Sequence, residues 1–228
     1  MRAPLGRART STSHEVLSLY RDAPLAVRAH VRMRWATCPL RAVAAQLPPV
    51  GQVLDVGCGH GLLSLHAALS SPGRSVLGVD VDGRKVAHAR AAAARARYQR
   101  GVDCDIAVAP PGELPEGPWD GVAIVDVLYL LHADAQRRLV VDCARRVAPG
   151  GVLAVKEMAL GPPWKFRWNK AQETLAVRVL GITEGGGHLT FVGPSAIGEW
   201  MAAAGLTVSH LSLQRGYPHP HHLVLGRR

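Results

Sequence analysis

A short apolar run followed by three glycines constrains this chain more than any other stretch. Residues 53–61 have the sequence VLDVGCGHG, and an apolar pattern with helical spacing begins at Leu62. A strand that turns through glycines into a helix presents backbone N–H groups to a ligand, because glycine lacks the Cβ atom that would keep the ligand away. The start of the helix adds unpaired N–H groups with partial positive charge. The sequence therefore predicts a ligand site at the end of a strand in an α/β sheet.

Two carboxylates and the glycine spacing restrict which ligand this turn can hold. Asp55 precedes the turn, and Asp80 ends the next apolar run, residues 75–79. A dinucleotide-binding turn has the spacing G-x-G-x-x-G, whereas here the third glycine, Gly61, comes one residue early and Leu62 takes the usual place. A carboxylate at Asp55 disfavours a pyrophosphate and suits a ligand with an amino group. Asp80 lies at the distance where a ribose diol is usually held.

Together these residues closely resemble the class I S-adenosylmethionine-dependent methyltransferases, over roughly residues 50–157. The resemblance implies that the acid and glycine loop hold the methionine part of the cofactor and that the acid after the second strand holds the ribose. It also implies that the stretch after the fourth strand lines the transferable methyl group. The cofactor-binding residues expected on this basis are Asp55, Gly57, Cys58, Gly59, Gly61, Asp80, Val81 and Asp126.

Apolar runs and helical runs alternate through the middle of the chain. This alternation predicts a doubly wound, mostly parallel α/β sheet with helices on both faces. Gly150 and Gly151 are expected to stop a helix just before the fifth strand. The resemblance implies seven strands in the order 3-2-1-4-5-7-6, with the last strand antiparallel. We expect strands at residues 51–56, 74–80, 102–108, 119–125, 151–157, 206–213 and 223–225, and helices at residues 61–70, 83–99, 134–147 and 195–204.

The length of 228 residues fits one domain with additions. Residues 1–13 are basic and free of acids, and we expect them to form a disordered tail. A single methyltransferase domain is expected over residues 14–228. Its parts are a helical leader at 14–49, a cofactor-binding core at 50–157, a substrate-side insertion with helices at 158–205 and a C-terminal strand pair at 206–228.

Charge and cysteine content narrow the class of partner and the compartment. The formal net charge is +10, nearly all from arginine, which permits nucleic acid, anionic lipid or an acidic substrate as partner. The arginines are spread along the chain, so we interpret them as solvated helix faces and disfavour nucleic acid. The four cysteines have no paired spacing, which predicts reduced thiols and a cytoplasmic location. No apolar stretch reaches membrane-spanning length.

The ends of the later strands carry the candidate substrate and catalytic residues. In open parallel sheets the site lies beyond the carboxyl ends of the strands. A hydroxyl acceptor would need a positioned base, and histidine suits that role. The candidate bases are His132, His219 and His221, and the candidate substrate residues are Tyr129, Lys156, Glu157, Trp164 and Tyr217.

Three other stretches affect the interpretation. Residues 162–170 interleave aromatic and cationic side chains, which could stack on bases, close an apolar pocket or make peripheral contact with a membrane. Residues 215–222 contain three histidines separated by prolines without a carboxylate or cysteine, so we expect no metal site. The resemblance implies an acid after the third strand that receives the adenine amino group. That position falls on Pro110, a departure, and Glu113 is the nearest substitute.

The sequence therefore predicts an S-adenosylmethionine-dependent methyltransferase that modifies a small, apolar or lipid-like metabolite, more readily on oxygen than on nitrogen or carbon. The preference for oxygen rests on the available histidines. An RNA methyltransferase, suggested by the isoelectric point near 10.2, is one alternative. A nicotinamide-dependent oxidoreductase and a non-catalytic cofactor binder are the others. Residues 126–132 lack the D/N-P-P-aromatic motif, which counts against nucleobase methylation.

Overall fold

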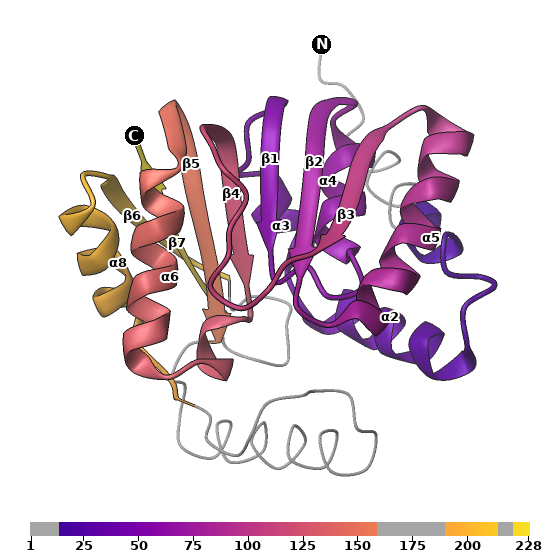
Figure 1. Cartoon of the computed structure of the whole chain (residues 1–228), viewed down its shortest axis with the longest axis horizontal. Coiled ribbons are helices and arrows are strands. Elements are labelled where there is room, and N and C mark those ends of the chain that lie inside the picture. Colours follow the sequence, from indigo (N-terminus) through magenta and orange to yellow (C-terminus); the bar gives the residue numbers. More distant parts are fainter. Residues whose placement is uncertain (1–13, 159–189, 214–220) are drawn as a thin grey trace.

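The computed structural model describes residues 14–158, 190–213 and 221–228. Within this part of the chain, one seven-stranded sheet has the order β3-β2-β1-β4-β5-β7-β6 (Figure 1). The strands are β1 (Val50–Val56), β2 (Gly73–Asp80), β3 (Asp103–Val108), β4 (Trp119–Val125), β5 (Val147–Met158), β6 (Thr207–Ser212) and β7 (His221–Arg227).

The direction of each strand follows from its connections. The first five strands are joined through helices or long crossovers and pair in parallel. β7 pairs antiparallel with both β5 and β6. The predicted fold class, strand order and antiparallel last strand are therefore confirmed. Because β1, β2, β3, β4 and β5 run the same way, their carboxyl ends meet at one edge of the sheet, the lower edge in Figure 1.

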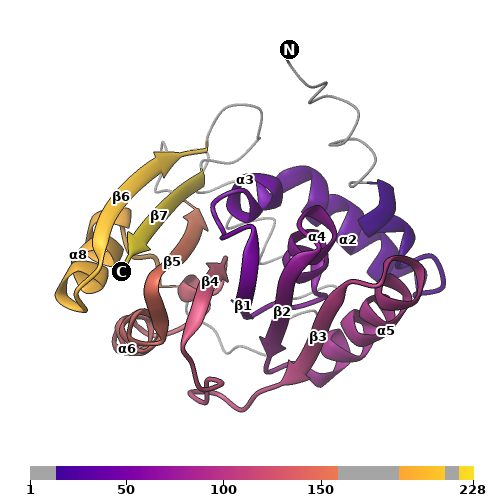
Figure 2. The same cartoon turned by 90° about the horizontal axis from the view of Figure 1, so that it is seen from above.

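Helices cover both faces of the sheet. Figure 2 shows α2, α3 and α4 on one face, and α6 and α8 on the other. The helices are α2 (Leu25–Thr37), α3 (Leu40–Ala44), α4 (Leu62–Ser70), α5 (Gly83–Arg100), the short 3-10 helix η1 (Leu128–Leu130), α6 (Ala133–Arg145) and α8 (Pro194–Ala203).

Alternate residues of the central strands enter two separate cores. In β1, Val53 packs with the helices of the leader, α4 and α5. Its neighbour Leu54 packs with residues of α6 and α8. This division follows from the two-residue period of a strand, which sends successive side chains to opposite faces. Both faces are apolar, as expected for a parallel sheet covered on both sides.

Helix α5 has clear start and stop signals in its sequence. The Asp82 side chain accepts hydrogen bonds from the backbone N–H groups of Arg84 and Lys85 at 2.9 and 3.2 Å. Gly101 ends the helix in the left-handed region with φ +65°. Alanines at every third or fourth position form the flat inward face, where they are buried against β3 and α4.

The boundary between α6 and β5 differs from the prediction. The helix ends at Arg145, and β5 already begins at Val147, ahead of the two glycines that were expected to stop the helix. The β4–β5 register shifts here, so that the first residues of β5 form an irregular start to the strand. Gly150 has φ +79° and its N–H donates to the Arg228 carbonyl at 2.9 Å. The glycines therefore serve a bend within a strand and not a helix stop.

The helical leader is anchored to the glycine loop and to α5. Tyr20 is buried, and its hydroxyl donates to the backbone carbonyl of His60. Arg95 of α5 donates to the Leu19 carbonyl at 2.6 Å and to Asp22 at 2.7 Å. Among the described residues, no helix has both the length and the apolar character needed to cross a membrane.

Candidate functional site

The glycine loop between β1 and α4 is held against the end of β2. The N–H groups of Gly57 and Cys58 donate to the Val79 carbonyl at 2.8 and 3.0 Å. Gly59 has φ +55°, and a Cβ atom built there would have no other atom within 4 Å. Open space over a left-handed glycine lets a ligand approach the backbone closely. The loop is therefore accessible at Gly59. The N–H groups of Gly57, Cys58 and Gly59, which the sequence predicted would face a ligand, are bonded within the protein instead.

The other two loop glycines are required by packing. A Cβ atom on Gly57 would lie 2.3 Å from the Val127 Cγ2 atom. A Cβ atom on Gly61 would lie 3.1 Å from the Ala89 Cβ atom of α5. The first contact brings the loop next to the segment after β4, and the second lets α4 and α5 pack closely. Two elements of the site are therefore adjacent because Gly57 has no side chain.

Asp80 at the end of β2 connects the loop to the start of α5. Its Oδ2 atom accepts the Gly59 N–H at 2.7 Å, and its Oδ1 atom accepts the Asp82 N–H at 2.9 Å. Each carboxylate oxygen has two lone pairs, so each can accept a further hydrogen bond. Val81, which follows it, is 62% exposed. Asp80 is therefore placed to hold a diol beside the loop.

Asp55 lies behind the loop. Its carboxylate is buried and accepts the Ser64 hydroxyl of α4 at 2.6 Å. Burial raises the pKa of Asp55 to about 6, and the bond from Ser64 opposes this increase. The side chain thus supports the turn between β1 and α4.

Asp126, the first residue after β4, lies in a buried charge cluster. Lys156 of β5 is fully buried, and its Nζ atom lies 2.6 and 2.7 Å from the two carboxylate oxygens of Asp126. Asp126 has φ +56°, a left-handed conformation that costs a non-glycine residue about 1 kcal/mol or more. Burial would raise the pKa of Asp126, but Lys156 and Arg34 hold it well below its usual range. Asp126 is therefore ionised, and its carboxylate is a weak proton acceptor.

Arg34 completes the cluster, although it was not among the residues predicted from the sequence. Its guanidinium comes from α2 and donates to Asp126 Oδ2 at 2.5 Å. The Cys38 thiol donates to the same oxygen at 3.6 Å. A signal was present in the sequence: Arg34 follows Val27 and Val31 at helical spacing and so shares their inward face. Arg28, three residues before Val31, also borders this face, whereas Arg32 is exposed. Helical spacing therefore separates Arg34 from Arg32 but not from Arg28.

Glu157 lies next to the cluster and supports the segment after β4. Its Oε1 atom accepts the N–H groups of Val127 and Leu128 at 3.0 and 2.8 Å. Burial and then the neighbouring charge of Asp126 raise the pKa of Glu157 to about 8. Lys156 and Glu157 are buried. The structure thus places these two predicted substrate residues underneath the site and not on its surface.

The remaining predicted residues have different environments. His221 is buried, and its Nε2 atom lies 2.9 Å from the Thr37 carbonyl of α2. His132 is exposed at the start of α6. Tyr129 stacks on Phe191 with ring centroids 5.6 Å apart. The structure therefore brings His221 toward the Asp126 cluster. Trp164, Tyr217 and His219 lie outside the described residues.

The loop after β3 has no carboxylate in the position of Pro110. Pro110 and Glu113 are both exposed, and the Glu113 N–H donates to the Pro110 carbonyl at 3.1 Å. This turn keeps Glu113 close to Pro110, the position where an acid was expected to receive the adenine amino group.

Over the described residues, no group of three or more histidine, cysteine or acidic side chains is arranged to hold a metal ion.

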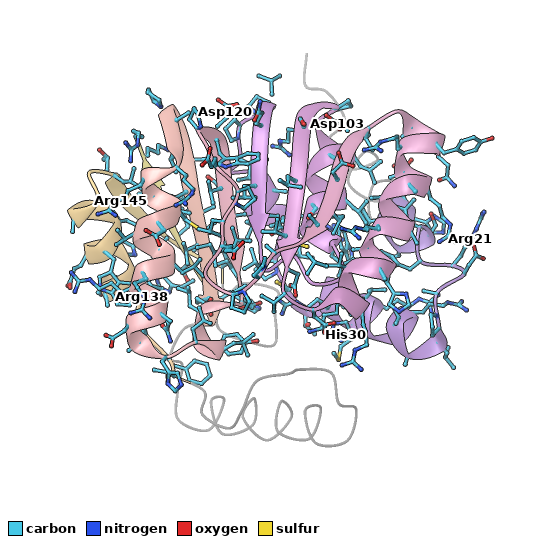
Figure 3. All side chains as sticks on the ribbon, in the orientation of Figure 1. Arg21, His30, Asp103, Asp120, Arg138 and Arg145 are labelled. Carbon is cyan, nitrogen blue, oxygen red and sulfur yellow. The ribbon has the colours of Figure 1, made fainter. Side chains whose placement is uncertain are left out.

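His60 of the glycine loop is covered by the leader. Its ring centroid lies 4.9 Å from that of His30 on α2 and 6.2 Å from that of His88 on α5. Figure 3 shows His30 at the lower end of the molecule, where the parallel strands end. Burial and then the charges of His30, Lys85 and His88 lower the pKa of His60 to about 4. His60 is therefore neutral at pH 7, and the uncharged ring can pack against His30 and His88.

Comparison with known proteins adds an independent finding. Residues 27–211 match a family model described as "Methyltransferase domain". The chain is 28% identical over 185 residues to the ubiquinone biosynthesis O-methyltransferase of Xanthomonas axonopodis pv. citri, which covers 76% of this chain and 70% of that protein. The protein of the same name from Pseudomonas aeruginosa is 29% identical over 164 residues, covering 70% of this chain and 66% of that protein. The chain spans about two thirds of the length of these relatives.

Solved structures with this fold include two methyltransferases. The S-adenosylmethionine-dependent methyltransferase SibL in its apo form gives a TM-score of 0.67 with 22% identity, over 89% of this chain and 57% of that chain. Magnesium protoporphyrin IX methyltransferase from Synechocystis, solved with bound S-adenosylhomocysteine, gives 0.65 with 19% identity, over 94% and 93%. At identities of 22% and 19%, the similarity to these structures shows a shared fold.

Proposed function

The chain belongs to the class I S-adenosylmethionine-dependent methyltransferases, and from this premise we propose that it methylates a small apolar metabolite on a hydroxyl oxygen. Family membership supplies the reaction class and the cofactor. The observation that carries the proposal for this chain is the glycine loop, open at Gly59 and tied to the carboxylate of Asp80.

The residues of the loop fit the cofactor. We assign Gly57, Cys58 and Gly59 to its methionine part, since Gly59 has open space above the backbone. We assign Asp80 to the ribose and the exposed Val81 to one face of the adenine. When bound, S-adenosylmethionine supplies a methyl group on a positively charged sulfur.

The charge cluster positions the end of the site that faces the methyl group. We assign Asp126 a positioning role, because Lys156 and Arg34 hold it ionised. Arg34 has five N–H donors, and the bond to Asp126 uses one of them. We therefore assign Arg34 to the carboxylate end of the cofactor. Lys156 and Glu157 act through Asp126 and the Val127 backbone and do not contact the acceptor.

An aromatic acceptor with a hydroxyl group agrees best with the surroundings. Tyr129 and Phe191 stack beside the segment after β4 and supply a flat apolar wall. Two curated relatives carry the name ubiquinone biosynthesis O-methyltransferase, which supports oxygen as the methylated atom. Methyl transfer needs an aligned acceptor in a site that excludes water, which an aromatic wall provides.

His221 is the best-placed candidate for the base. Its Nε2 atom lies 2.9 Å from the Thr37 carbonyl and so donates a hydrogen bond to that oxygen, which makes Nδ1 the ring atom assigned to take up a proton. His132 is exposed at the start of α6, away from the cluster. We therefore propose His221 as the residue that accepts the hydroxyl proton.

Two experiments test this function. Calorimetry with S-adenosylmethionine, S-adenosylhomocysteine and NAD tests the cofactor, and Asp80→Ala should weaken binding of the first two at least about tenfold. Transfer of a labelled methyl group to panels of phenols, amines and total RNA then tests the acceptor. We expect product from a phenol panel and a loss of turnover in His221→Gln with little change in cofactor affinity.

Each result separates the proposal from its alternatives. Binding of NAD with no binding of S-adenosylhomocysteine would contradict the cofactor assignment. Labelled RNA without labelled phenol would favour an RNA methyltransferase. Cofactor binding without any labelled acceptor would favour a non-catalytic binder. Unchanged turnover in His221→Gln, together with a loss in His132→Gln, would move the base to His132.

A further inference from the structure

The outward face of α2 is apolar, which is uncommon for a helix that covers a domain. Such a helix normally has charged or polar side chains on its outer face. Leu25 and Met33 are 74% and 57% exposed. Arg32 is the one charged residue in the exposed set of this helix. The exposed positions are Leu25, Ala26, Ala29, Arg32, Met33 and Ala36.

These positions form one continuous strip. At 100° per residue, all six fall within about a third of the helix circumference, with Arg28 at one border. The opposite side carries Val31 and Trp35, which are buried in the core, and Arg34, which binds Asp126. The helix is thus apolar on both sides, but the domain covers one of them. The Arg34 contact also places helix α2 at the edge of the sheet where the site lies (Figure 1).

The charged side chains of α2 itself all have one sign. Helix α2 contains Arg28, Arg32 and Arg34 and no acidic residue. Arg21, just before it, has a side chain that is 68% exposed. The nearby Asp22 pairs with two arginines, Arg95 at 2.7 Å and Arg21 at 3.5 Å. An apolar strip with an arginine border complements a surface that is both apolar and anionic.

We propose that α2 is the surface by which this protein lies on an anionic lipid bilayer. A second copy of the chain does not complement the strip as well, because a two-fold contact would bring the arginines of both α2 helices together with no carboxylate on either helix. Two large apolar side chains among alanines suit shallow insertion between lipid headgroups. Docking in this way turns the edge of the sheet that carries the site toward the bilayer.

Flotation of the full chain with vesicles tests the proposal and requires no methyl transfer. The vesicles are phosphatidylcholine, either pure or with about one third phosphatidylglycerol. We expect binding to the anionic vesicles that weakens with salt, and little binding to the neutral ones. Leu25→Glu with Met33→Glu should reduce the binding constant at least about tenfold, and Arg28→Gln with Arg32→Gln should reduce it by roughly twenty- to thirtyfold.

The matched control is Val50→Glu. Val50 is 64% exposed at the start of β1, on the opposite edge of the sheet, so it tests the loss of any exposed apolar side chain. Circular dichroism establishes that each variant is folded. The proposal is overturned if Leu25→Glu with Met33→Glu floats like the wild type, or if Val50→Glu loses binding equally. Absence of vesicle binding, with a wild-type dimer or protein complex that the α2 variant abolishes, would overturn it in favour of a protein partner.

Discussion

The ammonium group of Lys156 sits on both carboxylate oxygens of Asp126, at 2.6 and 2.7 Å, where solvent does not reach either side chain. This pair joins the ends of β4 and β5, and Arg34 extends it to α2. The carboxylate after β4 is therefore surrounded by cations before any ligand binds. The geometry of this charge cluster is set by α2, the end of β4 and β5, which are far apart in the chain.

Removing one member of this pair should be more harmful than removing both. Asp126→Asn leaves Lys156 buried without its counter-ion, and we expect a loss of about 3–5 kcal/mol in the free energy of unfolding. Asp126→Asn combined with Lys156→Met should lose less than the sum of the two single changes. Urea unfolding measures all three. Asp103→Asn is the control, because the Asp103 side chain is 60% exposed at the opposite edge of the sheet (Figure 3). Additive losses would show that the pair is not coupled.

Two arginines on α2 should differ in their effect on the cofactor. Arg34→Gln removes the cation that binds Asp126, so we expect the dissociation constant for S-adenosylhomocysteine to rise about tenfold or more. Arg32→Gln on the exposed face should leave it within about twofold. Calorimetry gives both constants. Equal affinities in the two variants would remove Arg34 from the site.

Two glycines with the same backbone conformation should respond differently to alanine. Gly59 and Gly101 have φ of +55° and +65°, and a Cβ atom at either would meet nothing within 4 Å. Each substitution should cost about 1 kcal/mol of stability through backbone strain. We expect Gly59→Ala in addition to lose S-adenosylhomocysteine binding, because its methyl group fills the space over the loop. Thermal unfolding and calorimetry separate the two effects, and retained binding in Gly59→Ala would contradict the cofactor placement.

Acid should loosen the contact between the leader and the glycine loop. The pKa of His60 is lowered from 6.5 to about 4 in the folded protein, so the unfolded chain binds the proton first. The contribution of neutral His60 to the free energy of unfolding is fully present above about pH 6.5. It is lost as the pH falls toward 4, by up to about 3 kcal/mol. His60→Gln should flatten this part of the stability profile. The same change at the exposed His14 should not, and a wild-type slope in His60→Gln would assign the loss to other groups.

The sequence predicted the elements of the fold and the position of the glycine turn well, because both depend on residues that are close together in the chain. Strand and helix periods repeat within a few residues, and the glycine turn needs a run of nine residues, 53–61. The order of strands came from the family resemblance. The bend at Gly150 was misplaced, since a glycine in a sequence looks the same whether it ends a helix or bends a strand.

The charge cluster was predicted in part. The sequence placed three polar residues at the ends of strands, Asp126, Lys156 and Glu157. It predicted that each would contact a ligand separately, Asp126 the cofactor and the other two the substrate. The tertiary structure pairs the first two and places all three below the surface. Parallel strands place the ends of β4 and β5 side by side, and this proximity decides that the acid meets the lysine.

By itself, the sequence determined a doubly wound sheet and a glycine turn between two carboxylates, because hydrophobic period and backbone freedom are properties of neighbouring residues. The tertiary structure decided which of three similar arginines enters the site and which acid is held ionised. It also decided which face of α2 remains exposed. These outcomes depend on packing between segments as distant as Arg34 and Asp126, and local composition carries no record of that packing.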